Sequence, residues 1–224
     1  MLPRVIIHNG VSVDGRMDWF DGDLGLYYGL AAQLEAEAIL SGSQTMLAGL
    51  DAAIEEMAAM EPSQSPPENT EDEQGVMVVV DSQGQLRKLH HLKVTPYWRD
   101  TIVLCSMVTP ADYLNYLGQH RFDFIQVGEQ KVDLRAALTI LKDDYGINVI
   151  RVDSGGVLNG VLLREGLVDE VSLMITPRLV GGETPRSFFV GPDLASAEDV
   201  IPLRLIQVEE VGGGYVWQRY KVIK

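Results

Sequence analysis

The sequence predicts an α/β fold with a mostly parallel sheet and an antiparallel C-terminal hairpin. Short β-branched or apolar runs of strand length alternate with helical segments, as in sheets built from parallel strands. The run at 76–80 (VMVVV) is apolar throughout, and the run at 101–105 (TIVLC) is apolar after Thr101, which is typical of strands covered on both faces. Near the C-terminus, extended segments at 203–211 and 215–223 flank three glycines and indicate a hairpin.

The remaining elements follow from local composition. β-branched or apolar runs predict further strands at 4–9, 38–42, 122–127, 148–153 and 170–179. Leu, Ala and Glu content predicts helices at 24–37, 45–60, 110–119 and 134–145, and a further helix follows Gly156. The segment from Pro62 to Gly75 contains prolines, acidic residues and other polar residues, and apart from the prolines it has no aliphatic or aromatic side chain. We therefore expect a solvated surface loop there. We expect one domain over residues 1–224, because no domain boundary is evident.

Composition narrows the classes of function. The chain has 224 residues, one cysteine and a formal net charge of −14. A single cysteine excludes an internal disulfide, and the N-terminus does not resemble a signal peptide, so we expect a soluble cytoplasmic protein. The negative charge disfavours nucleic acid and anionic membranes, yet permits a phosphorylated small ligand held by backbone amides.

Three turns at predicted strand ends carry small or hydroxylic residues. Asp153-Ser-Gly-Gly156 links a strand to a helix, and Ser41-Gly-Ser-Gln-Thr45 does the same earlier in the chain. Asp81-Ser82 follows a third strand, with Arg87 nearby. Because ligands of open α/β sheets bind beyond the carboxyl ends of the strands, these turns together favour one elongated anionic ligand. Each turn alone is also explained by capping or tight chain reversal, and no GxGxxG fingerprint is present.

Other reactive side chains point to no site. His90-His91 lacks a third ligand at a recognisable spacing, so we predict no metal site. Cys105 lies inside an apolar run and is expected in the core.

The motifs resemble the riboflavin-biosynthesis reductases: the C-terminal domain of the bifunctional deaminase–reductase and its stand-alone archaeal relatives. The matching segments are 8–16 (HNGVSVDGR), 39–45 (ILSGSQT), 79–82 (VVDS) and 152–182 (VDSGGVLNGVLLREGLVDEVSLMITPRLVGG). The resemblance implies a dihydrofolate-reductase-like three-layer fold, NADPH as cofactor and a homodimer. The apolar region from Val168 to Leu179 is the contact strand that we expect in such a dimer.

The resemblance also implies roles for individual residues. Cofactor contacts are expected from Gly42, Ser43, Thr45, Ser82, Arg87, Ser154, Gly155 and Gly156. Contacts to the nicotinamide and the substrate are expected from Asn9, Ser12, Asp14 and Asp153. The implied reaction reduces a ribosylamino-pyrimidine phosphate to the ribitylamino compound by hydride transfer to the sugar C1.

Two features depart from the family pattern and leave alternatives open. Asp153 stands where the family usually has Glu, and no arginine occurs between Arg16 and Arg87, in the stretch where the family carries a substrate-holding segment. A reductase of this fold with a different, unphosphorylated heterocyclic substrate is therefore one alternative. A non-catalytic nucleotide-binding or sensing domain is the other.

Overall fold

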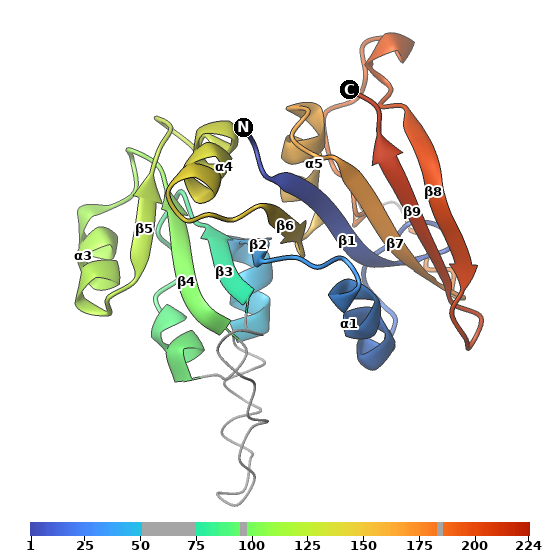
Figure 1. Ribbon diagram of the computed structural model, residues 1–224, viewed down its shortest axis with the longest axis horizontal. Helices are drawn as coiled ribbons and strands as arrows, with labels where there is room; N and C mark the ends of the chain where they lie inside the picture. The colour runs from blue at the N-terminus through green and yellow to red at the C-terminus, as the bar shows by residue number, and fades with distance from the viewer. Residues whose placement is uncertain (51–74, 95–97, 183–185) are drawn as a thin grey trace, which may run out of the picture. The chain divides into compact units, whose positions relative to one another are not determined.

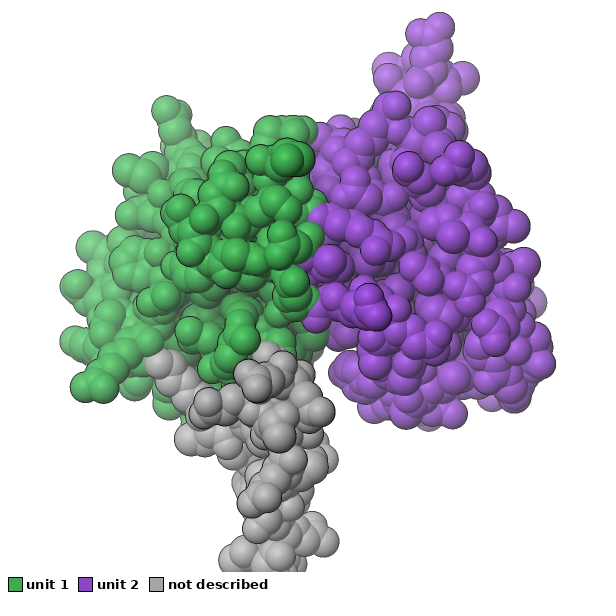
Figure 2. All heavy atoms as spheres, in the orientation of Figure 1, with its two compact units in different colours: residues 1–3, 37–148 green, residues 4–36, 149–224 purple. Residues whose placement is uncertain are grey.

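The computed structural model describes residues 1–50, 75–94, 98–182 and 186–224, and these residues form two compact units (Figure 2). Unit 1 comprises Met1–Pro3 and Glu37–Asn148; unit 2 comprises Arg4–Ala36 and Val149–Lys224. The predicted helical continuation from 51 to 60 and the acidic loop, up to residue 74, lie outside the described residues. That the two units together form one domain over residues 1–224 stays a prediction.

Unit 1 contains parallel strands only among its described residues, in the order β5-β4-β3-β2 (Figure 1). The strands are β2 (Ala38–Gly42), β3 (Gly75–Val80), β4 (Trp98–Cys105) and β5 (Asp123–Gln126). The helical segments are 43–50, the 3-10 helix η2 (Leu89–Val94), α3 (Ala111–Gln119) and α4 (Leu134–Asp143). The alternation of strands and helices read from the sequence is thereby confirmed for this unit.

Alternating residues of the unit 1 strands are buried on both faces. Met77, Val79, Val103 and Cys105 point into a core cluster with the segment 43–50, η2 and α3. The intervening residues, such as Val78, are also fully buried. This two-sided burial is why the apolar runs lack the polar alternation of a half-exposed strand.

Unit 2 has the strand order β6-β1-β7-β9-β8, and its last two strands form the predicted antiparallel hairpin. The strands are β1 (Arg4–Ser12), β6 (Val149–Val152), β7 (Glu170–Thr176), β8 (Leu203–Glu210) and β9 (Val216–Val222). The helices are α1 (Leu24–Ala32), α5 (Gly156–Arg164) and the short 3-10 helix η3 (Ala197–Asp199). Gly212, Gly213 and Gly214 all have positive φ, which explains the glycine run between β8 and β9.

Helix α1 packs on one face of the unit 2 sheet. Its Tyr27 and Leu30 join Ile6 of β1, Met174 of β7 and Trp217 of β9 in one buried cluster. The helix is shorter than the predicted span to Glu37, ending at Ala32. A left-handed φ of 51° at Glu35 takes the chain out of the helical conformation.

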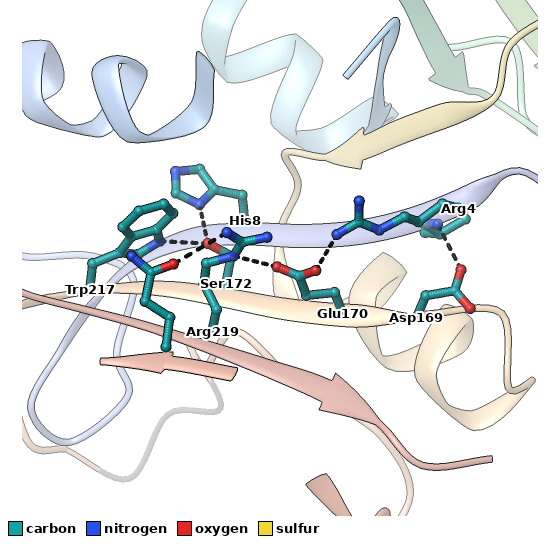
Figure 3. A network of polar contacts seen from close by, with 9 residues as sticks. Arg4, His8, Asp169, Glu170, Ser172, Trp217 and Arg219 are labelled. Atoms are coloured by element: carbon teal, nitrogen blue, oxygen red, sulfur yellow. Dashed lines mark hydrogen bonds and ion pairs between the residues drawn. The ribbon is translucent and has the colours of Figure 1, made fainter. Parts of the chain in front are cut away.

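A buried carboxylate joins three strands of unit 2. Glu170 of β7 is 3% exposed and forms ion pairs with Arg4 of β1 and Arg219 of β9 (Figure 3). A carboxylate removed from water in this way requires a charged or hydrogen-bonding partner, and here it has two.

The region Val168–Leu179, where we expect a dimer contact, is mostly an interior strand of unit 2, and the dimer itself stays a prediction. Most of this region is β7, which is paired on one side with β1 and on the other with β9. Val168 and Val171 are buried within the chain. An interior strand has no free edge to offer, so the apolar character of the region reflects the core of unit 2.

Among the described residues, none of the helices has the length and hydrophobicity that crossing a bilayer requires.

Candidate functional site

The carboxyl end of β6 lies beside the middle of β1 in unit 2. The parallel register pairs Ile7 with Val152, so Asp153 follows at the level of His8. Asn9 Nδ2 donates to the carbonyl of Ser154 over 3.1 Å. Three residues predicted to bind substrate or cofactor, Asn9, Asp153 and Ser154, are therefore brought together by strand pairing.

A buried amide holds this turn in place. Asn159 of α5 is fully buried, and its Nδ2 donates to Asn9 Oδ1 at 2.7 Å and to the Phe188 carbonyl at 2.8 Å. Asn9 is 2% exposed, so its amide serves the turn between β6 and α5. Sequence reasoning missed Asn159; its signal was an uncharged polar residue on a helix that is otherwise apolar up to Arg164.

The glycines of the turn are explained in part by the chain itself. Gly155 is the N-cap of α5, with extended φ and ψ of −73° and 166° and no side-chain capping bond. A Cβ on Gly156 would lie 2.0 Å from the Ser187 carbonyl oxygen. The close backbone approach predicted here is real, but at Gly156 the approaching group is the chain's own segment.

Tyr27 and Arg151 complete the surroundings of Asp153, and sequence reasoning missed both. The Tyr27 hydroxyl lies 2.8 Å from Asp153 Oδ1 and 3.0 Å from the His8 carbonyl oxygen. Arg151 lies 3.5 Å from Asp153 Oδ2. Burial raises the pKa of the Asp153 carboxyl, while the Arg151 charge opposes that rise. Burial and the neighbouring Asp153 raise the pKa of Tyr27 well above its ordinary value.

His8 is a buried, neutral histidine behind this carboxyl group. Its Nδ1 lies 2.9 Å from Ser172 Oγ, which accepts a hydrogen bond from Trp217 Nε1 at 2.8 Å (Figure 3). Its Nε2 faces the Tyr27 carbonyl, an acceptor only, which assigns the proton to Nε2. Burial, with the Arg151 charge second, lowers the pKa of His8 from 6.5 to about 4.

Ser12 and Asp14 lie further along the chain and hold a second loop. Ser12 is four residues beyond His8 on β1, about 13 Å along an extended strand. Asp14 accepts hydrogen bonds from the Ser12 hydroxyl and from the amides of Val180 and Gly181. The Ser12 hydroxyl and these amides hold the pKa of Asp14 well below its usual range. The structure therefore shows Ser12 and Asp14 tying down the 180–181 turn.

In unit 1, the ends of β2 and β3 lie side by side. The register pairs Gly42 with Val80, which places Ser43 and the Asp81-Ser82 turn at the same sheet edge. The helical segment 43–50, which includes Thr45, begins at Ser43. Ser41 Oγ at the end of β2 is buried and has no hydrogen-bond partner among the described residues. Strand pairing thus brings Gly42, Ser43 and Ser82 to one edge of the unit 1 sheet.

Ser82 and Arg87 are positioned by other parts of unit 1. The Ser82 hydroxyl accepts from the Val132 amide at 3.1 Å. Arg87 lies over the Tyr113 ring, 5.1 Å from its centroid, and pairs with Asp112 at 3.0 Å. The Arg87 side chain is 44% exposed, so its guanidinium remains accessible to an anion.

Cys105 and the His90-His91 pair, from which we expect no chemistry, are held by packing and ring contacts. Cys105 is fully buried, and burial raises the pKa of its thiol to about 12. His90 stacks on His120, lies tilted against His91 and contacts the Tyr116 hydroxyl. Within the described residues, no group of three His, Cys, Asp or Glu side chains has a geometry that would hold a metal ion.

Solved structures share this fold. A pyrimidine reductase-like protein from Corynebacterium diphtheriae superposes with a TM-score of 0.69 at 17% identity, covering 99% of this chain and 92% of that chain. The riboflavin biosynthesis reductase Rib7 of Saccharomyces cerevisiae gives a TM-score of 0.63 at 19% identity, covering 99% and 90%. At these identities the similarity establishes the fold, and it confirms the mixed α/β class predicted from the sequence.

Curated relatives match at the level of sequence. The 2,5-diamino-6-ribosylamino-4(3H)-pyrimidinone 5′-phosphate reductase of Methanothermobacter thermautotrophicus is 29% identical over 92% of each chain. RibD of Escherichia coli is 24% identical over 94% of this chain, which spans 58% of that longer protein. The family model described as the RibD C-terminal domain matches residues 3–217. The chain belongs to the RibD C-terminal domain family, as the motifs at 8–16, 39–45, 79–82 and 152–182 had indicated.

Proposed function

We propose that this protein is the pyrimidine reductase of riboflavin biosynthesis. It reduces a ribosylamino-pyrimidine 5′-phosphate to the ribitylamino compound with NADPH. The observation that carries this proposal is the match to a reductase of that name over 92% of both chains. The family match over residues 3–217 also supports it.

The donors at each set of turns, taken within its own unit, suit a phosphate group. In unit 2, the first amides of α5 lack a side-chain cap and lie next to Ser154, as suits an anion. In unit 1, the buried Ser41 hydroxyl is unpartnered among the described residues, and Ser43 and Thr45 follow it. We propose that Gly42, Ser43, Thr45, Ser154, Gly155 and Gly156 contact the cofactor phosphates, with Ser82 and Arg87 at the 2′-phosphate.

When bound, the nicotinamide supplies the hydride. The chain's own residues bind the cofactor and the substrate, orient them, and supply a proton to the substrate. Asp153 is half-buried and is the carboxyl group of the strand-end turn, so we propose that it faces the substrate with Asn9 beside it. We assign Ser12 and Asp14 to the substrate side through the 180–181 turn that they hold.

The first experiment is titration of the purified protein with NADPH by fluorescence or calorimetry. It is followed by NADPH oxidation with the diaminopyrimidinone phosphate and with 5-amino-6-(5-phosphoribosylamino)uracil. Binding with turnover of either phosphate supports the proposal. Binding without turnover of either contradicts it. Equal turnover of the dephosphorylated compounds would show that the phosphate is not recognised.

Arg87→Ala tests the cofactor assignment. If Arg87 contacts the 2′-phosphate, the variant loses affinity for NADPH by about tenfold, as expected for one charge-assisted contact, and keeps its affinity for NADH. Arg99→Ala is the matched control, because Arg99 is an exposed arginine at the opposite end of the unit 1 strands. Equal losses for both cofactors would remove Arg87 from the site.

We also propose a cytoplasmic homodimer that binds neither nucleic acid nor membranes. The net charge of −14 supports the absence of polyanionic partners. Light scattering coupled to gel filtration tests the assembly, with a mass near twice that of one chain as the expected result and the mass of one chain as the contrary one.

A further inference from the structure

Tyr27 places one hydroxyl proton between two acceptors. The hydroxyl oxygen is 2.8 Å from Asp153 Oδ1 and 3.0 Å from the His8 carbonyl oxygen. A tyrosine hydroxyl carries a single proton and also accepts, whereas a carbonyl only accepts. Both contacts are therefore hydrogen bonds at once when Asp153 is protonated: Asp153 donates to Tyr27, and Tyr27 donates to His8.

The same hydroxyl also suits the ionised carboxylate. Rotation about the C–O bond turns its proton from the His8 carbonyl towards Asp153 Oδ1, without movement of the ring. The ring itself is fixed, because it packs in the core cluster of unit 2 and lies 4.5 Å from the His8 imidazole. Tyr27 thus provides a partner for Asp153 in either protonation state.

The charged and titratable groups around this pair are few. Arg151 of β6 faces Asp153 Oδ2, and its Nε has no hydrogen-bond partner among the described residues. Tyr28 of α1 meets the Tyr27 ring edge-on. His8 of β1 is neutral at pH 7, and the charge of Arg219 of β9 contributes to the lowering of its pKa after burial and Arg151. Arg151 is thus the one cation that contacts the carboxyl group among the described residues.

We propose that Tyr27 is a positioning residue that lets Asp153 hold and release a proton in one fixed orientation. On release, the O–H bond of the Asp153 carboxyl breaks, the proton passes to a basic atom of the bound substrate or to water, and the Tyr27 hydroxyl turns to the new carboxylate. The delivery to substrate rests on the proposed function; the exchange between Tyr27 and Asp153 does not.

Nuclear magnetic resonance of the whole protein tests the exchange without turnover. With ¹³C at the tyrosine Cζ and at the aspartate carboxyl carbons, the Tyr27 and Asp153 signals should titrate with one common midpoint. Asp153→Asn keeps a hydrogen-bonding partner but removes the titration, so the Tyr27 signal should become flat. Independent midpoints, or an unchanged Tyr27 titration in Asp153→Asn, would overturn the proposal.

Tyr27→Phe removes the hydroxyl and keeps the packed ring. Because a bond to an ionised acceptor is about twice as strong as a neutral one, its loss should raise the midpoint of Asp153 by about one pH unit. Tyr28→Phe makes the same chemical change one residue away and should leave that midpoint within a few tenths of a unit. An unmoved midpoint in Tyr27→Phe refutes the assignment.

Turnover then separates the two proposals. In an active enzyme, the pH dependence of kcat governed by Asp153 should move by the same amount in Tyr27→Phe, with little change in the KM for NADPH. If the pH dependence of kcat does not shift in Tyr27→Phe, Asp153 does not transfer a proton to the substrate. Absence of turnover in the unchanged protein would overturn the proposed function, and the spectroscopic titration would still decide the role of Tyr27.

Discussion

Acidification should destabilise this protein through one buried histidine. The pKa of His8 is lowered from 6.5 to about 4, so the unfolded chain binds a proton between these values that the folded chain does not. Stability therefore rises with pH across this window and is lost as the pH falls through it. Between pH values above 6.5 and below 4, this effect lowers the free energy of unfolding by about 3 kcal/mol in all, and about 2 kcal/mol of that loss has already occurred at pH 5.

Urea unfolding at pH 7 and pH 5, compared with that of His8→Asn, measures this loss. The asparagine keeps a polar group near Ser172 but does not titrate. The unchanged protein should lose about 2 kcal/mol more than the variant between the two pH values. Asp153 acts with the opposite sign, because its raised pKa contributes stability at low pH that is lost as the pH rises, and subtraction of the variant removes this contribution. Equal losses, or a His8 resonance that titrates near 6.5, would refute the reasoning.

Two further predictions concern packing. Gly160→Ala should lower the free energy of unfolding by about 1–3 kcal/mol or more, because its Cβ would lie 1.8 Å from the Val190 carbonyl oxygen. Gly118→Ala is the control, because Gly118 is also helical and a Cβ there would meet nothing within 4 Å, so this variant should not lose stability. Similar denaturation midpoints for the two variants would contradict the prediction. Cys105 should resist a thiol reagent in the folded protein, because its thiol is buried and its pKa is about 12; modification at the rate of a free thiol at pH 8 would show that the β4 core opens.

The strands could be predicted from the sequence because their signals are local. The run at 76–80 is apolar at every position, since β3 is covered on both faces, and Ala38–Gly42 was predicted to the residue. Helix ends were less accurate. Helix α1 stops five residues before the predicted end, where the positive φ of Glu35 had no sequence signal.

The site was predictable only as far as its strand-end turns. Asp153, Ser154 and Gly155 stand out because a polar residue and glycines interrupt a strand-to-helix junction. The assembly around them depends on strand order, which local composition does not encode. Tyr27 is 126 residues away from Asp153 in the sequence and resembles any other apolar-face residue of a helix rich in Leu and Tyr.

The contact between Tyr27 and Asp153 follows from the topology once the strand order is known. Because β6 pairs with β1, Asp153 emerges beside His8, and α1, which packs over β1, brings Tyr27 to the same point. A shorter carboxylate at 153 suits this geometry, since the hydroxyl already lies 2.8 Å from Oδ1. Asp153→Glu should therefore push the carboxyl group past Tyr27 and uncouple their titrations, whereas a retained common midpoint would show that the length of the side chain is immaterial.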